Sequence, residues 1–324
     1  MTKQFIDIFN GDADGICALV QLRRENPQSA ELITGIKRDI NLLKRVEDGE
    51  GKHLTVLDVS FEKNEKDVKR LLKQGATIDY FDHHKTGELV SHERLKVNIN
   101  LSKDTCTSLI VDKKLQGRYR SWAITGAFGD NLINQAQALG LESGFSESEL
   151  SLLKQLGIYL NYNGYGSSLE DLFFDPKILY KKIQPFNTPF DFLKKDTETF
   201  DTLATGYQQD MSKADQMPPI FNTNDVAIIL LPNEQWARRV SGVFGNDLAN
   251  KFPNRAHAIV TEKNNGNYLV SIRAPINKKN GADQLASQFP SGGGRKAAAG
   301  INDLPKDQLE IFMATMQSQF KMNR

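Results

Sequence analysis

The sequence predicts an α/β protein with an N-terminal, mainly parallel-sheet domain and a smaller C-terminal α/β domain, joined by a helical region and a linker. In the first half of the chain, short β-branched or aromatic runs alternate with helical patterns, as in strands joined by crossover helices. A second set of strand and helix patterns follows a segment with several prolines. The length of 324 residues also exceeds that of one small domain.

The N-terminal domain is predicted to span residues 1–184. Its strand patterns are "FIDIF" (5–9), "ELITGI" (31–36), "LTVLDVS" (54–60) and "ATIDYFD" (76–82). Helical patterns cover 15–26 and 62–74, and residues 105–183 are mostly helical. This order of elements predicts a largely parallel sheet with helices packed on it.

The C-terminal domain is predicted to span residues 221–324, after a linker region at 185–220. Its predicted elements are a strand at 225–232, a helix at 234–252, a hairpin at 256–275, a short helix at 281–289, a glycine-rich loop at 290–300 and a helix at 305–320. The hairpin is expected to turn near Asn264–Gly266, where Asn and Gly favour a tight turn.

Composition indicates a soluble globular protein, since 39% of the residues are hydrophobic and 25% are charged. A formal net charge of +1 excludes an overall basic field for long nucleic acids, so anion binding is expected to be local. Cys17 and Cys106 lack the spacing of a disulfide framework or zinc site. Without a signal peptide or an apolar run of about 20 residues, the chain is predicted to be cytoplasmic and not bound to a membrane.

Acidic residues follow several of the predicted strands. Asp12 and Asp14 come after the first strand, Asp58 lies at the end of the third, and "DHH" (82–84) closes the fourth. Because the carboxyl ends of parallel strands meet at one edge of a sheet, and ligands bind at that edge, we expect these side chains to form one site.

The stretch "NGDADG" (10–15) has three interpretations. A calcium-binding EF-hand needs a bidentate Glu at position 12, where this chain has Gln21, and a preceding helix where this chain has a strand pattern. A polar turn that caps the next helix explains the stretch alone. It does not explain Asp58 and "DHH" at the same edge.

The third interpretation is a site for two divalent metal ions. Clustered carboxylates repel one another, and bound cations relieve that repulsion. Carboxylates together with imidazole suit Mn²⁺ or Mg²⁺. Two such ions can activate water and stabilise the leaving oxygen of a phosphoryl group.

These motifs, in this order, resemble the DHH superfamily of phosphoesterases. The resemblance includes "DAD" (12–14), Asp58, "DHH" (82–84) and Asp130 in "ITGAFGDN". In the second domain, "LVSIRAP" and "SGGGRKAAAG" resemble segments of the DHHA1 substrate-binding domain. The resemblance covers about 1–131 and 225–324.

The resemblance implies a role for each site residue. Two Mn²⁺ or Mg²⁺ ions would be held by Asp12, Asp14, Asp58, His83 and Asp130, with Asp58 as the bridge between them. Asp82 and His84 would form an outer catalytic shell that orients the ligands, and His84 is alternatively a general acid.

Substrate contacts are predicted for a further set of residues: Arg38, Thr107, Ser108, Arg273, Gly292, Gly293, Gly294 and Arg295. Helix capping remains an alternative for the threonine and serine, and a surface position for Arg38. Two positions depart from the family pattern. Asn10 stands where many members have His or Asp, which predicts a weaker ligand, and Arg295 stands where His is common.

The predicted function is metal-dependent hydrolysis of phosphodiester bonds in the cleft between the domains. Short oligonucleotides, dinucleotides or other small phosphate esters are the expected substrates. Both a monomer and a homodimer are compatible with the sequence. The alternatives are a single-strand-specific exonuclease, a pyrophosphate or polyphosphate hydrolase, and a nucleotide-binding regulatory protein with a degenerate site.

Overall fold

The computed structural model describes residues 4–321. Within the chain, residues 1–204 and 205–324 form two compact units. The observed α/β architecture, with a parallel sheet in the first unit and a second sheet in the other, confirms the predicted fold class. None of the helices formed by the described residues is long and apolar enough to cross a bilayer.

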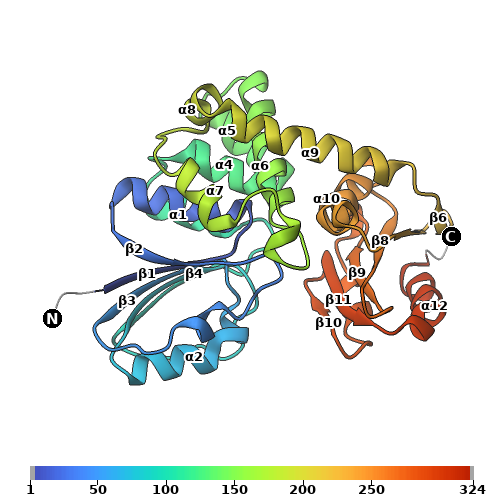
Figure 1. The fold of residues 1–324 in the computed structure, drawn as a ribbon, viewed down its shortest axis with the longest axis horizontal. Helices are drawn as coiled ribbons and strands as arrows, with labels where there is room; N and C mark the ends of the chain where they lie inside the picture. The colour runs from blue at the N-terminus through green and yellow to red at the C-terminus, as the bar shows by residue number, and fades with distance from the viewer. Residues whose placement is uncertain (1–3, 322–324) are drawn as a thin grey trace. The chain divides into compact units, whose positions relative to one another are not determined.

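The first unit contains a five-stranded sheet in which every neighbouring pair of strands is parallel. The order is β2-β1-β3-β4-β5 (Figure 1). The strands are β1 (Gln4–Phe9), β2 (Ala30–Ile33), β3 (Lys52–Leu57), β4 (Thr77–Asp82) and β5 (Leu95–Ile99). From β1 the chain adds β2 on one side of the sheet, and it then returns to the other side of β1 to add β3, β4 and β5. The strand order therefore reverses between β1 and β3. Ligand crevices form at such a reversal.

Strand β5 is absent from the sequence prediction. Lys96 and Asn98 alternate with apolar residues in this strand, and every residue of it remains at least partly exposed. A short, half-exposed strand at the edge of a sheet gives only a weak apolar signal.

Helices pack on both faces of this sheet (Figure 1). The first unit contains α1 (Ala13–Glu25), α2 (Phe61–Lys73), α3 (Thr107–Lys114), α4 (Arg120–Gly129), α5 (Ile133–Glu142), α6 (Glu147–Asn163), α7 (Pro176–Ile183) and α8 (Pro189–Lys195). Helix α2 lies on one face, where Phe61 and Val68 join the core of Ile8 and Val56 (Figure 1). Helices α1, α4, α6 and α7 lie on the opposite face (Figure 1).

Two glycines let α1, α4 and α6 approach closely. A Cβ at Gly129 would lie 2.3 Å from the Cβ of Ala13 and 2.8 Å from the carbonyl oxygen of Gly157. A Cβ at Gly157 would lie 2.2 Å from the carbonyl oxygen of Thr125. Side chains at these positions would force the helices apart. The small residues of "ITGAFGDN" therefore bring the end of α4 close to the start of α1.

The segment predicted as a linker, residues 185–220, is largely helical. It contains α8 and the long helix α9 (Thr197–Asp215). The boundary between the two compact units falls inside α9, between Ala204 and Thr205. Of the prolines in this segment, Pro185 lies between α7 and α8, Pro189 is the first residue of α8, and Pro218 and Pro219 follow α9, where a missing N–H costs little.

The second unit contains a six-stranded sheet in the order β10-β11-β9-β8-β7-β6. Only β7 and β8 run parallel, and the other pairs are antiparallel. Its elements are β6 (Pro219–Asn222), β7 (Val226–Leu231), α10 (Gln235–Lys251), β8 (Ala256–Glu262), β9 (Tyr268–Arg273), α11 (Ala282–Ala286), β10 (Gly292–Gly294), β11 (Ala298–Leu304) and α12 (Leu309–Phe320). The hairpin between β8 and β9 turns at Gly266, which has φ +81°, as its sequence predicts.

His257 in β8 makes stability of the second unit depend on pH. The side chain is buried, and neither ring nitrogen has a hydrogen-bond partner. Burial, followed by the positive charge of Arg255, lowers its pKa from 6.5 to about 4. Between pH 6.5 and about 4, His257 is protonated in the unfolded chain and stays neutral in the folded chain. Stability is therefore retained above about pH 6.5 and falls as the pH drops towards about 4.

We expect His257→Phe to remove this pH dependence. A pKa difference of this size corresponds to about 3 kcal/mol. Urea unfolding at about pH 7.5 and about pH 4.5 should show that the wild type loses up to about 3 kcal/mol more than the variant. Equal losses in both proteins would mean that His257 does not titrate in this range.

Candidate metal centre

The candidate centre is built at the carboxyl ends of β1, β3 and β4. Asp12 caps α1, and Asp14 lies in its first turn. Asp58 directly follows β3, Asp82 ends β4, and Asp130 follows the last residue of α4. The prediction that strand ends bring these residues to one edge agrees with these positions.

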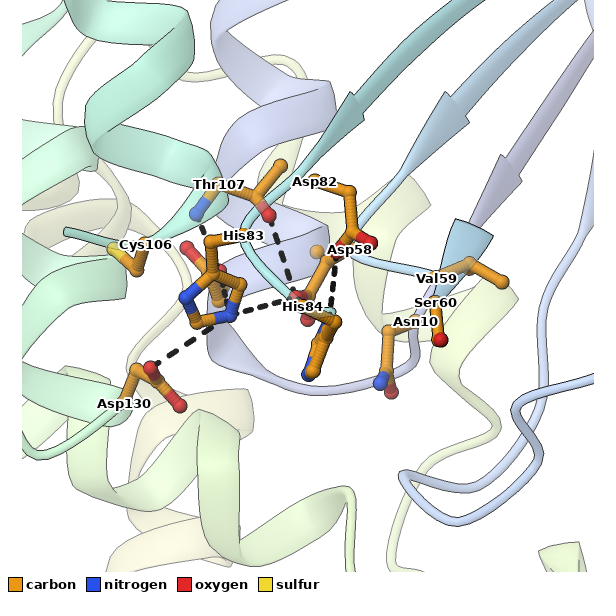
Figure 2. Close-up of polar contacts among 12 residues, drawn as sticks. Asn10, Asp58, Val59, Ser60, Asp82, His83, His84, Cys106, Thr107 and Asp130 are labelled. Carbon is orange, nitrogen blue, oxygen red and sulfur yellow. Dashed lines mark hydrogen bonds and ion pairs between the residues drawn. The ribbon is translucent and has the colours of Figure 1, made fainter. Parts of the chain in front are cut away.

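His83 is the residue around which the carboxylates gather. Its Nε2 lies 3.3 Å from Asp58 Oδ1, 3.8 Å from Asp14 Oδ2 and 3.9 Å from Asp130 Oδ2. Figure 2 shows the ring between Asp130 and Asp58. Its Nδ1 lies 3.0 Å from the carbonyl oxygen of Thr105. That oxygen can only accept, so Nδ1 carries a proton, and Nε2 is the ring atom that faces the carboxylates. A metal ion bound among these carboxylates would take Nε2 as its ligand.

Asp58 holds an unfavourable charge at the centre of this group. Its backbone has φ +57°, and its side chain is almost fully buried. Asp is one of the residues that adopt this left-handed conformation most readily. Burial, followed by the negative charges of Asp12 and Asp14, raises its pKa well above the ordinary value. A bound cation would reverse that effect.

Thr107 and Ser108 hold the carboxylates in place. Their backbone N–H groups donate to Asp14, with distances of 2.8 Å from Thr107 N to Oδ2 and 2.7 Å from Ser108 N to Oδ1. The Thr107 hydroxyl donates to Asp58 Oδ1 at 3.3 Å. Both residues are completely buried. In this structure the two backbone N–H groups position Asp14 and the Thr107 hydroxyl positions Asp58, and substrate contact by Thr107 and Ser108 stays a prediction.

Asp12 pairs with Lys37, which lies in the loop after β2. Asp12 Oδ1 accepts from the N–H groups of Asp14 and Gly15, both at 3.1 Å, and Oδ2 accepts from Lys37 Nζ. Burial by itself would raise the pKa of Asp12, but the charge and hydrogen bond of Lys37 outweigh it and lower the pKa. Lys37 also donates to Asn161 Oδ1 at 2.9 Å. No sequence signal indicated Asn161.

Asp82 and His84 form a second pair beside the cluster. His84 Nδ1 lies 2.7 Å from Asp82 Oδ1, and the N–H of Phe61 donates to Asp82 Oδ2 at 3.3 Å. Asp82 is completely buried, whereas 30% of the His84 side chain is exposed. Asp82 thus fixes the orientation of a ring whose other nitrogen, Nε2, is left for chemistry.

The donors present suit a divalent metal ion. Ligand atoms of Asp58, His83 and His84 all lie within 4.8 Å of one another. Asn10 is buried, and its Oδ1 has no hydrogen-bond partner, while its Nδ2 donates to the Lys37 carbonyl at 3.4 Å. Buried oxygens usually have a partner. Because His84 Nδ1 is bound to Asp82, His83 is left as the imidazole ligand, and an imidazole with carboxylates and an amide oxygen suits Mn²⁺ or Mg²⁺.

The predicted glycine-rich loop is instead a β-hairpin. Gly292–Gly294 form β10, which pairs with β11, and Arg295 N donates to the Ala298 carbonyl at 2.8 Å across the turn. A Cβ at Gly292 would lie 1.8 Å from the Ala286 carbonyl oxygen. Gly294 has φ +145°. These two glycines are required by the packing, whereas a Cβ at Gly293 would meet open space. Their anion binding stays a prediction.

Arg38 lies in the loop that follows β2 and is partly buried. Its contact with substrate remains a prediction.

Arg273 is anchored within its own unit. Its guanidinium donates from Nε to Asn246 Oδ1 at 2.5 Å, from Nη1 to the Ile272 carbonyl at 3.0 Å and from Nη2 to the Gly242 carbonyl at 3.1 Å. Asn246 and Gly242 belong to α10, so these bonds join that helix to β9. Arg273 therefore has a structural role in joining α10 to β9, and its binding of substrate stays a prediction.

We expect Arg273→Ala to lower the free energy of unfolding by about 1–3 kcal/mol, because it leaves partly buried acceptors unpaired. Urea unfolding of the full chain measures this loss. Arg255→Ala, which removes an arginine that binds Asn222 and the Val226 carbonyl in the same unit, serves as the reference for such a loss. An Arg273→Ala protein as stable as the wild type would contradict the structural role of the guanidinium.

The comparisons with known proteins agree with this architecture. Residues 224–322 match the model of the DHHA1 domain. No curated protein sequence matches the chain. Among solved structures, exonuclease RecJ bound to manganese has a TM-score of 0.61 at 14% identity, with 98% of this chain and 89% of that chain covered.

Two further structures have the same fold. RecJ from Thermus thermophilus in complex with Mn²⁺ has a TM-score of 0.64 at 14% identity, with 98% of this chain and 52% of that chain covered. PggH from Vibrio cholerae, a pGpG-specific phosphodiesterase, has a TM-score of 0.55 at 13% identity, with 98% of this chain and 99% of that chain covered. Residues 224–322 are thus similar to the DHHA1 domain, the chain as a whole shares the fold of RecJ and PggH, and both findings agree with the resemblance to the DHH/DHHA1 superfamily.

Proposed function

We propose that this chain is a metal-dependent phosphodiesterase that hydrolyses dinucleotides or short oligonucleotides. The observation that carries the proposal is the position of His83. Its Nε2 lies within 4 Å of three carboxylates. Such a group is unstable without a cation and suits Mn²⁺ or Mg²⁺. RecJ, which has a similar fold, has been crystallised with both ions.

The proposed ligands are His83, Asp14, Asp58 and Asp130. A bound divalent ion would supply the positive charge that activates water and stabilises the oxygens of the phosphoryl group. The protein holds Asp14 through two backbone N–H groups and His83 through the Thr105 carbonyl. The ligand geometry therefore needs little rearrangement before the reaction.

The Asp82–His84 pair is proposed to transfer a proton. Because His84 Nδ1 is held by Asp82, Nε2 is the atom that can give a proton to the leaving oxygen. Asp82 keeps the ring in this orientation. The partial exposure of His84 is consistent with access to a bound ester.

A small substrate is favoured over a long strand. The net charge of +1 provides no extended basic field, although phosphate contacts dominate affinity for long nucleic acids. PggH, a phosphodiesterase specific for pGpG, matches this chain over almost its whole length. The second candidate is a single-strand exonuclease, which the similarity to RecJ supports. The chain spans about half of the Thermus thermophilus RecJ chain.

The proposal is tested by a substrate panel with the purified chain and Mn²⁺. The panel contains linear dinucleotides, short RNA and DNA single strands of increasing length, pyrophosphate and polyphosphate. We expect the highest kcat/KM for dinucleotides, a steady decrease with strand length, and no turnover with excess chelator. Highest activity on long DNA would favour the exonuclease. Turnover that survives chelation would contradict metal dependence.

A further inference from the structure

Lys37 occupies the one oxygen of Asp12 that a metal ion would need. The other oxygen, Oδ1, already accepts two backbone N–H groups, from Asp14 and Gly15. A carboxylate oxygen has two lone pairs, so Oδ1 is saturated. Oδ2 is bound to the Lys37 ammonium. Both oxygens of Asp12, which is buried to 2% exposure, are therefore already engaged by protein donors.

The ammonium is held in place by several contacts. Lys37 Nζ donates to Asn161 Oδ1 at 2.9 Å and lies 5.5 Å from the ring centroid of Tyr165. The backbone N–H of Lys37 donates to the Gly164 carbonyl at 2.8 Å. Its own carbonyl accepts from Asn10. Anchors on both sides of the side chain therefore fix the ammonium over Asp12.

A divalent ion on Asp12 would have to displace this ammonium. The displaced charge would be left in a largely buried place without its carboxylate, which is strongly unfavourable. If both cations stayed, they would repel each other at short range with little water between them. Around His83 Nε2, by contrast, the neighbouring groups are the carboxylates of Asp14, Asp58 and Asp130, so this cluster remains suited to an ion.

We infer that this chain binds one divalent metal ion, at the His83 cluster, and that the Lys37 ammonium takes the place of a second ion at Asp12. This inference rests on the proposed metal-dependent function and revises the two ions that the sequence predicts. Asp12 thereby becomes a carboxylate that positions α1 and Lys37, and the second positive charge beside the substrate is a permanent part of the protein.

The test is to count Mn²⁺ ions per chain. Metal-free protein is dialysed against Mn²⁺, the bound metal is measured by mass spectrometry, and electron paramagnetic resonance distinguishes an isolated ion from a spin-coupled pair. We expect one isolated ion in the wild type and in Lys37→Arg. We expect a coupled pair in Lys37→Met. The matched control is Lys44→Met, which removes an exposed lysine and should keep one ion.

Asp12→Asn decides the question if Lys37→Met fails to fold. Under the one-ion arrangement, this variant still binds one ion with an affinity close to that of the wild type. A wild type with two ions, one of which is lost in Asp12→Asn, would overturn the inference and leave the proposed function intact. A single ion in folded Lys37→Met would overturn the role of Lys37. No bound ion in any protein would overturn the proposed function as well.

Discussion

Asp58→Asn should reduce phosphodiester hydrolysis by about 10³-fold or more and leave the metal-free protein at least as stable as the wild type. Asp58 is buried in the centre of the carboxylates, where burial and the charges of Asp12 and Asp14 raise its pKa. Asparagine removes that charge, keeps the size of the side chain and tolerates φ +57°. The same change removes a negative charge from the cation site.

The measurement has two parts. Turnover of a dinucleotide is followed over a range of Mn²⁺ concentrations, and thermal unfolding is recorded with chelator present. Asp79→Asn is the matched control, because Asp79 lies on β4 and pairs with His53 at 3.2 Å, away from the cluster. It should keep its activity. Asp58→Asn with wild-type turnover would remove Asp58 from the site, and a large loss of metal-free stability would assign it a structural role.

His83→Gln and His84→Gln should impair different properties of the enzyme: the first should weaken metal binding, and the second should lower kcat. His83 Nε2 faces three carboxylates, so its loss should raise the Mn²⁺ concentration for half-maximal rate by about 10²-fold, with activity returning at high Mn²⁺. His84 is bound to Asp82 and partly exposed, so its loss should lower kcat by about 10²–10⁴-fold at an unchanged Mn²⁺ requirement.

Metal titrations of turnover separate these outcomes. Asp82→Asn serves as a companion variant: it should lower kcat as His84→Gln does, but less, because it disturbs the orientation of the ring and keeps the ring itself. The reverse pattern, with His84 controlling the metal requirement and His83 only kcat, would mean that the two roles within "DHH" have to be exchanged.

The sequence by itself determined the parallel sheet and the place of the site. Periodicity identifies β1, β3 and β4, and the ends of parallel strands must share an edge. Asp12, Asp58 and Asp82 follow those strands, so their proximity required no knowledge of side-chain packing. The ordered motifs also predicted the second domain, which the DHHA1 match at 224–322 confirms.

Tertiary structure alone decided how these residues are held. Thr107 binds Asp14 across 93 positions of the sequence, and Lys37 meets Asn161 across 124. Spacing along the chain carries no signal for such pairs, because they depend on how α1, α3 and α6 pack. The sequence likewise predicted a loop at the glycines of β10. Only the folded structure shows that Ala286 and Ala299 leave no room for side chains at Gly292 and Gly294. Local patterns specify elements and their ends, whereas the partners of a buried charge are set by helices brought together from distant parts of the chain.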